Sequence, residues 1–258
     1  MKSIWNSFVI AFSMYSKIPM PRVEWKERDR RYVMLFFPLV GLVIAVLEWA
    51  WFLLCLHGNI GSALRAAIAV LIPVAVSGGI HVDGFLDVSD ACSSWREREE
   101  RLRILKDPHV GAFAVISAAV YFVLALGLAS EVTAASAPIL FLIFPLSRVF
   151  SAIGVTLLPS ISADGTAAAF TGGSARGVNL CLLFVFAAVI FVRMFLHAPL
   201  IAVFVLLGLV CAVLYTLYLV FRVFKGYSGD VAGHFLCVAE LCMLAGAVAA
   251  EILFRGSL

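Results

Sequence analysis

The residues best suited to chemistry are three aspartates spaced four and three residues apart. Asp83, Asp87 and Asp90 lie in the stretch GGIHVDGFLDVSD, at the end of a long apolar run. His81 precedes them. On a helix this spacing places the three carboxylates on one face, because each residue turns the helix by roughly 100°. Such carboxylates repel one another, so they indicate a site for a divalent cation such as Mg²⁺, completed by substrate phosphates. The alternative is a solvated helix face.

Two further polar turns hold residues that suit phosphate or metal binding. Lys106, Asp107 and His109 open an apolar run in the sequence KDPHVG, where the first amides of a helix would face an anion. A helix cap with proline in the first turn explains the same residues equally well. In the turn GYSGD, Asp230 precedes the last apolar run. It is either a helix cap or a second ligand for metal or substrate.

Charged residues inside the apolar runs need an explanation, because each costs about 2.5–3.5 kcal/mol at the middle of a membrane span. Arg148 lies near the middle of its run and Glu240 about two turns into the last one. We expect Arg148 to serve a phosphate or a structural carboxylate, and Glu240 is the candidate partner. Glu48, Arg193 and Glu251 lie nearer the ends of their runs, where placement at the membrane interface explains them.

The composition places the chain among integral membrane proteins. Of its 258 residues, 63% are hydrophobic and 14% charged, and the mean hydropathy is +1.06. Runs of about 20 apolar residues each span a bilayer. We predict an all-α, polytopic helical bundle that forms a single membrane-embedded catalytic domain over residues 1–258, with an interfacial helix over 4–15. The seven predicted spans are 33–56, 63–80, 111–129, 138–158, 178–196, 200–221 and 235–254.

Basic residues are shared unevenly between the connections. Most of the 19 Lys and Arg residues fall in alternate connections, which the positive-inside rule places in the cytoplasm. The acidic stretch, the loop 159–177 and the turn 225–234 then reach the same cytoplasmic face. So does the segment 94–106, whose pattern of Trp95, Leu102 and Leu105 predicts a helix on the membrane surface or over the site. We therefore expect one active site that faces the cytoplasm.

Several motifs along the chain carry a family resemblance. In order they are FSMYSKIPMPR, FFPLVGLVIA, GGIHVDGFLDVSDA, ILKDPHVGAFAV, LSR at 146–148 and GYSGDVAG at 226–233. Together they resemble the cobalamin (5'-phosphate) synthase family, the adenosylcobinamide-GDP ribazoletransferases. The resemblance implies a Mg²⁺-dependent enzyme of the bacterial or archaeal cytoplasmic membrane. Its substrates would be the corrinoid adenosylcobinamide-GDP and α-ribazole or its 5'-phosphate, and it would release GMP.

This chemistry requires a ribose hydroxyl to attack phosphorus while a pyrophosphate linkage breaks. We expect Asp83 and Asp87 to bind the metal and Asp90 to be a third ligand or the general base. His81 is a weaker candidate for proton transfer. The residues expected to contact substrate are Lys106, Asp107, His109, Arg148 and Asp230, of which Asp230 could complete a second metal position.

Two other functions share some of these features. A CDP-alcohol phosphotransferase is also a helical membrane enzyme with aspartate pairs and Mg²⁺. Its DGxxAR signature is absent, because Asp87 stands where that signature has the alanine that precedes its arginine. An ion-coupled transporter using Arg148 and Glu240 would be expected to show repeat symmetry and polar groups at both faces. The net charge of +3 is modest and says little about nucleic acid, and we expect no nucleic-acid partner. The sequence leaves a homo-oligomer open.

Overall fold

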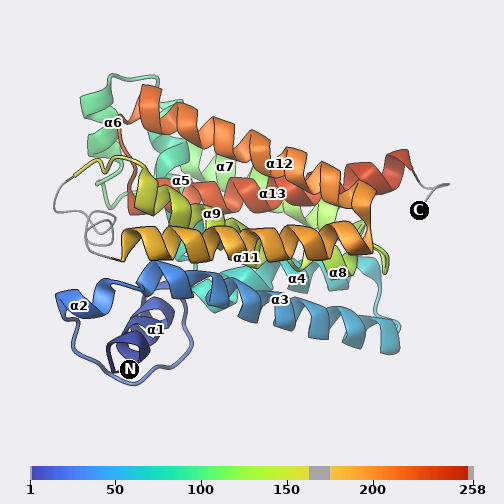
Figure 1. Cartoon of the computed structure of the whole chain (residues 1–258). Coiled ribbons are helices and arrows are strands. Elements are labelled where there is room, and N and C mark those ends of the chain that lie inside the picture. Colours follow the sequence, from blue (N-terminus) through green and yellow to red (C-terminus); the bar gives the residue numbers. More distant parts are fainter. Residues whose placement is uncertain (1, 163–174, 255–258) are drawn as a thin grey trace.

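The computed structural model describes residues 2–162 and 175–254, and its elements are helices, of which the long ones α3, α11, α12 and α13 run alongside one another (Figure 1). Within these residues a single isolated β-bridge joins Ser160 to Tyr227. The helices are α1 (Lys2–Tyr15), α2 (Glu27–Arg30), α3 (Val33–His57), α4 (Ser62–Ser77), α5 (Ile80–Ser93), α6 (Arg98–Ile104), α7 (Ala112–Ser130), α8 (Ala137–Leu140), α9 (Ile143–Leu157), α11 (Arg176–His197), α12 (Pro199–Tyr218), the π-helical η1 (Leu219–Val223) and α13 (Gly229–Leu253).

The predicted membrane-spanning bundle is confirmed. Six helical segments of the described chain are long and apolar enough to cross a bilayer, and a seventh crossing results if the bent pair α4–α5 counts as one. Their outer faces carry many exposed aliphatic and aromatic side chains, which suit lipid. In Figure 1, α2 and α6 lie at one end of the bundle and the carboxyl terminus at the other. The protein is an integral membrane protein with multiple spans.

The second predicted span, 63–80, is not one continuous helix. Its helix α4 ends at Ser77, and α5 leaves it at an angle of 96°. The break falls at Gly78 and Gly79, whose φ angles of 66° and 82° lie in the left-handed region that glycine adopts without steric cost. A side chain at Gly78 would also collide with the side chain of Lys17. The bend places the acidic stretch on a helix of its own.

The last helix, α13, is the centre of the bundle and packs against α5, α9 and α12. It begins at Gly229 rather than at residue 235, so Asp230 belongs to its first turn. Glycines allow close helix contacts here, as is common in membranes. Gly208 of α12 lies against the backbone at Cys242, and Gly246 of α13 lies against the backbone at Phe204. The central position of α13 lets it carry Asp230 to the acids of α5.

The predicted helix near the amino terminus is confirmed as α1, and polar contacts fix it to the segment that follows. The side-chain amide of Asn6 donates to the Asp29 carboxylate at 2.9 Å, and the Ser7 hydroxyl donates to the Asp29 carbonyl at 2.6 Å. Burial of Asp29 makes these bonds valuable, because an unpaired buried carboxylate is costly. The hydrogen bond from Asn6 holds the pKa of Asp29 below its usual range.

The surface helix predicted over 94–106 is shorter than expected. Helix α6 begins only at Arg98, and Trp95 precedes it with a positive φ of 53° and an exposed fraction of 89%. Trp95 therefore does not share a helix face with Leu102 and Leu105, which pack against the bundle. Of the predicted loop 159–177, residues 163–174 lie outside the described residues.

Candidate active site

Four carboxylates gather where α5 crosses α13. Asp83, Asp87 and Asp90 follow one another along α5, and Asp230 lies in the first turn of α13. The charges of Asp83, Asp90 and Asp230 all act on the carboxyl group of Asp87, and that of Asp83 also acts on Asp230. The structure therefore brings the predicted acids of two distant motifs into one electrostatic group.

Two glycines make this meeting of helices close. A Cβ atom on Gly84 would lie 2.8 Å from the carbonyl oxygen of Asp230, and one on Gly233 would lie 3.0 Å from the carbonyl oxygen of His81. Real Cβ atoms hardly ever approach other atoms so closely, so the two main chains touch because neither residue has a side chain. The separation of Asp83 and Asp230 is thus set by backbone contact.

Asp230 is not the N-cap residue of α13, which was one of the two roles that its position suggested. The hydroxyl of Ser228 caps α13 by accepting a hydrogen bond from the Val231 amide at 3.2 Å. The Ser228 hydroxyl also lies 3.4 Å from the Asp230 carboxylate, to which it donates. Ser228 serves the amide of Val231, so Asp230 is not needed as the cap of this helix.

The acidic group has the character of a site for a divalent cation that substrate completes. Among the described residues, no ion pair involves any of the four carboxylates. In the same ranges no three acidic, histidine or cysteine side chains converge closely enough to enclose a metal. Mg²⁺ is commonly held by one or two carboxylates together with water and substrate phosphates. Two of these carboxylates, such as Asp83 and Asp87, fit that requirement.

Asp90 has a structural partner that the sequence did not reveal. Its Oδ1 accepts a hydrogen bond from the Ala114 amide, at 3.3 Å, in the first turn of α7. The N-cap residue of α7 is Gly111, which has no side chain with which to cap the helix. A Cβ atom there would collide with the Asp90 carboxylate. One amide at the start of this helix is therefore bonded by a carboxylate of the protein itself, and binding of a substrate anion there stays a prediction.

Two cavities of about 200 Å³ each meet at Gly229 and Asp230. The first is bordered by Lys106 of the segment after α6 and by polar atoms of Ser160 and Ser228. The second is bordered by Asp83 and His81 and is otherwise mostly apolar. Lys106 thus borders the same cavity as Asp230, and its contact with a substrate phosphate stays a prediction.

Asp107 and His109 contact each other rather than the acids. The ring Nδ1 of His109 lies 2.7 Å from Oδ1 of Asp107, and the His109 amide donates to the same oxygen at 2.9 Å. These hydrogen bonds hold the pKa of Asp107 below its usual range. Both side chains are exposed and border neither of the two cavities. Their substrate contacts stay a prediction.

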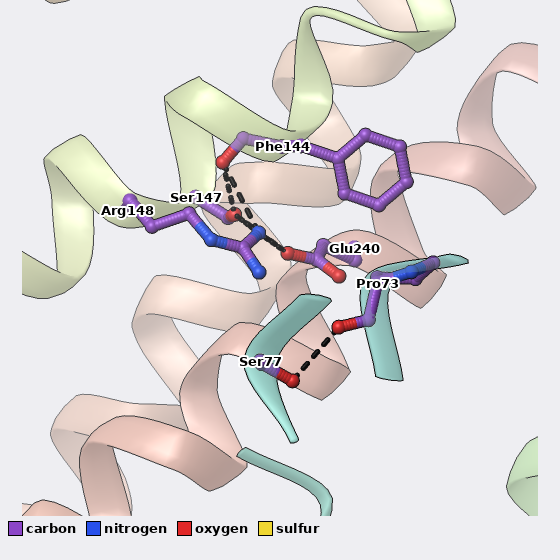
Figure 2. Close-up of polar contacts among 6 residues, drawn as sticks. All are labelled: Pro73, Ser77, Phe144, Ser147, Arg148 and Glu240. Carbon is purple, nitrogen blue, oxygen red and sulfur yellow. Dashed lines mark hydrogen bonds and ion pairs between the residues drawn. The ribbon is translucent and has the colours of Figure 1, made fainter. Parts of the chain in front are cut away.

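Arg148 forms the predicted ion pair with Glu240 inside the bundle (Figure 2). Its guanidinium Nη1 also donates to the Ser147 hydroxyl at 3.0 Å and to the Phe144 carbonyl at 3.2 Å, and only 1% of Arg148 is exposed. Ser147 donates in turn to Glu240 at 2.8 Å. The head group is therefore engaged in a buried network that compensates its charge. A phosphate-binding role for Arg148 remains a prediction.

Two other acids are more buried than their positions near span ends indicated. Glu48 is 3% exposed, borders a small apolar cavity together with Glu240, and has an Oε1 atom without a hydrogen-bond partner in the described residues. Glu251 is buried as well and accepts a hydrogen bond from the Thr133 hydroxyl at 2.6 Å. Neighbouring helices therefore cover both side chains, and their placement at the membrane interface stays a prediction.

Sequence reasoning also missed the part played by Tyr227. Its ring is buried, its amide donates to the Pro159 carbonyl at 2.7 Å, and its carbonyl accepts from the Ile161 amide at 3.1 Å. These bonds join the turn before α13 to the segment after α9 and shape one border of the Lys106 cavity. The aromatic residue within GYSGD was the available signal, because a tyrosine in a polar turn usually packs against something.

Comparison with known proteins gives the family. The model of the cobalamin-5-phosphate synthase family matches residues 7–248. An adenosylcobinamide-GDP ribazoletransferase of Lachnoclostridium phytofermentans is 39% identical over 95% of this chain and 94% of its own length. Enzymes of that name from Clostridium botulinum and Desulfitobacterium hafniense are each 33% identical, over 93% and 96% of this chain and 96% of their own lengths. No solved structure matches significantly. The chain belongs to the cobalamin-5-phosphate synthase family.

Proposed function

We propose that the acids at the crossing of α5 and α13, together with Lys106, form the active site of a ribazoletransferase. By its family the protein is an adenosylcobinamide-GDP ribazoletransferase, a transferase of cobalamin biosynthesis. The observation that carries the site is the convergence of Asp83, Asp87 and Asp230, from two motifs far apart in the sequence, beside two cavities and without a basic partner in the described residues.

In the proposed reaction a ribose hydroxyl of α-ribazole, or of its 5'-phosphate, forms a new bond to the phosphorus that carries the corrinoid. The pyrophosphate bond breaks, the hydroxyl proton is released and GMP leaves. Phosphoryl transfer of this kind depends on positioning and on compensation of phosphate charge more than on covalent chemistry. The described residues supply both, because the helix crossing fixes the acids and Lys106 borders the same cavity as Asp230.

Asp83 and Asp87 would hold a Mg²⁺ ion, with Asp230 as a ligand of that ion or of a second one. When bound, the ion would offset the negative charge of the pyrophosphate and acidify the attacking hydroxyl. Lys106 binds a phosphate oxygen from the side of the cavity that it borders together with Asp230. Asp90 holds the start of α7 and thereby the loop that carries Lys106, although a role as third ligand or as general base stays open to test. His81 is a candidate for proton transfer.

We also propose that this end of the bundle faces the cytoplasm of a bacterium. The basic residues around α2 and α6 lie at the same end as the acids, which the positive-inside rule assigns to the cytoplasm (Figure 1). The phosphorylated substrates would then reach the site from the cytosol. The relatives named above come from bacteria.

The experiment is a transferase assay of the purified protein in lipid vesicles, with adenosylcobinamide-GDP, α-ribazole 5'-phosphate and Mg²⁺. We expect release of GMP and formation of adenosylcobalamin 5'-phosphate, loss of both with a chelator, and recovery when Mg²⁺ is restored. Asp83→Asn should abolish turnover, whereas Glu99→Gln, at an exposed acid of α6 outside both cavities, should keep it. Folded wild-type protein that releases no GMP would refute the proposal, and equal turnover by both variants would remove Asp83 from the site.

A further inference from the structure

The second of the two cavities at Asp230 extends from α13 to the helices near the amino terminus. Its wall is formed mainly by apolar and aromatic side chains of α1, α3 and α13, among them Tyr15, Phe37 and Leu236. The exposed Asp83 marks its open side and the buried His81 its inner side. The segments FSMYSKIPMPR and FFPLVGLVIA, which carry part of the family resemblance but none of the proposed catalytic residues, contribute Met14, Tyr15 and Phe37 to this wall. The cavity is therefore built to enclose an apolar group beside the acids.

The wall also holds a buried polar atom that has no partner among the described residues. This atom is Nε2 of His81, a residue that is 7% exposed. The imidazole forms a cluster with two aromatic rings, with centroid distances of 6.4 Å to Tyr15 and 5.9 Å to Phe37, and the latter two rings are 4.3 Å apart. A buried ring nitrogen without a hydrogen bond is costly, so a ligand that supplies one complementary atom would be favoured. The aromatic side chains in this wall favour an aromatic ligand.

The chemical groups of the two substrates differ sharply in how well they match this cavity. A corrin ring is far larger than about 200 Å³. Guanine and the adenine of the adenosyl group each carry several donors and acceptors, most of which would lose their hydrogen bonds against an apolar wall. The base of α-ribazole is a benzimidazole with two methyl groups, an apolar bicyclic ring with one unsubstituted nitrogen that accepts a hydrogen bond. This base alone fits both the size and the polarity of the cavity.

We propose that this cavity, which we call the base pocket, receives the benzimidazole of α-ribazole, and that a small rotation of the His81 ring lets the now buried Nε2–H donate to its free ring nitrogen. The inference rests on the proposed function and adds to it which substrate lies where. The ribose then lies at the opening, beside Asp83 and Asp230. The guanylated pyrophosphate approaches from the cavity of Lys106, on the other side of Asp230. Attacking and leaving groups thus enter from two directions, as an in-line displacement requires.

Filling the base pocket tests the proposal. Ala232 is half-buried and borders the pocket from α13, so Ala232→Leu places three extra carbon atoms in it. Ala245→Leu is the matched control, because Ala245 is half-buried on the same helix and borders none of the cavities described above. We expect Ala232→Leu to raise the KM for α-ribazole about tenfold or more and to change the KM for adenosylcobinamide-GDP by less than about twofold. A rise confined to the KM for adenosylcobinamide-GDP would assign the pocket to the other substrate and overturn the proposal.

Binding measurements separate this inference from the catalytic one. Calorimetric titration of α-ribazole into the Asp83→Asn protein in nanodiscs should show binding, because the pocket remains when turnover is lost. Adding Ala232→Leu should abolish it, and adding His81→Phe, which keeps an aromatic ring but removes Nε2, should weaken it about tenfold. Guanosine should not compete. Unchanged binding in the Ala232→Leu protein would overturn the base pocket, while GMP release by the wild type would leave the transferase assignment standing.

Discussion

The carboxylate of Asp90 lies at the start of α7, where its Oδ1 accepts a hydrogen bond from the backbone amide of Ala114 at 3.3 Å. A residue of α5 thus caps a helix that begins more than 20 positions later in the chain. The arrangement depends on Gly111, since a side chain at the N-cap position would occupy the place of the Asp90 carboxylate. The third acid of the motif is therefore tied to the fold, whereas Asp83 lies exposed and unpaired among the described residues.

Substitutions at Asp90 should separate capping from catalysis. Asp90→Ala removes the acceptor and should cost about 1 kcal/mol of stability. Asp90→Asn keeps an acceptor oxygen and should retain most of the turnover, in contrast to Asp83→Asn. Thermal unfolding in detergent and the GMP-release assay measure the two effects. If Asp90→Asn were as inactive as Asp83→Asn while equally stable, Asp90 would belong with the metal ligands or act as the base.

Gly84→Ala should impair catalysis without removing any polar group. The added Cβ would lie 2.8 Å from the Asp230 carbonyl oxygen, so α5 and α13 must move apart and carry Asp83 away from Asp230. Alanine normally stabilises a helix by roughly 0.5–1 kcal/mol relative to glycine, and Gly127→Ala in α7, which meets open space, should show that gain. We expect kcat to fall about tenfold or more for Gly84→Ala alone. Equal kcat values for the two variants would contradict a site set by backbone contact.

The Arg148–Glu240 pair should stabilise the bundle only as a pair. Removing one partner leaves an uncompensated buried charge and should cost about 3–5 kcal/mol, whereas Arg148→Met combined with Glu240→Leu should cost much less than either single change. Thermal unfolding of the two single variants and the double variant in one detergent forms the necessary cycle. Additive losses would show that the contact in Figure 2 contributes little.

Gly78→Ala should loosen the bend between α4 and α5 for two separable reasons. Its φ of 66° disfavours any side chain, and the new Cβ would collide with Lys17. Adding Lys17→Ala to Gly78→Ala removes the collision and should therefore restore only part of the lost stability. The backbone strain, which costs about 1 kcal/mol, should remain in the double variant. Gly61→Ala, at a position with negative φ and open space, is the control. Hydrogen exchange at the amides of α5 would report the loosening, and full rescue would rule out the backbone contribution.

Features that depend on local sequence were predictable, and those that depend on distant contacts were not. The apolar runs predicted the long helices, since hydropathy acts within one segment, and the rarity of mid-span charges pointed to Arg148 and Glu240 as partners. The apolar run through residue 80 hid the bend, because its cause is a left-handed backbone at two glycines. The cap from Asp90 to α7 and the burial of Glu48 arise only when helices pack together.

The meeting of Gly84 with the start of α13 also limits how the chain can vary in length. The main chain of Gly84 contacts that of Asp230, and the main chain of Gly233 contacts that of His81. The positions of Asp83 and Asp230 relative to each other therefore depend on the number of residues between these contacts on each helix. One residue inserted between Asp230 and Gly233 would turn Asp230 by roughly 100° about the axis of α13 and carry it off the face toward α5. Homologous chains should therefore vary freely at lipid-facing residues, but they should have no insertion or deletion within residues 81–84 or 230–233.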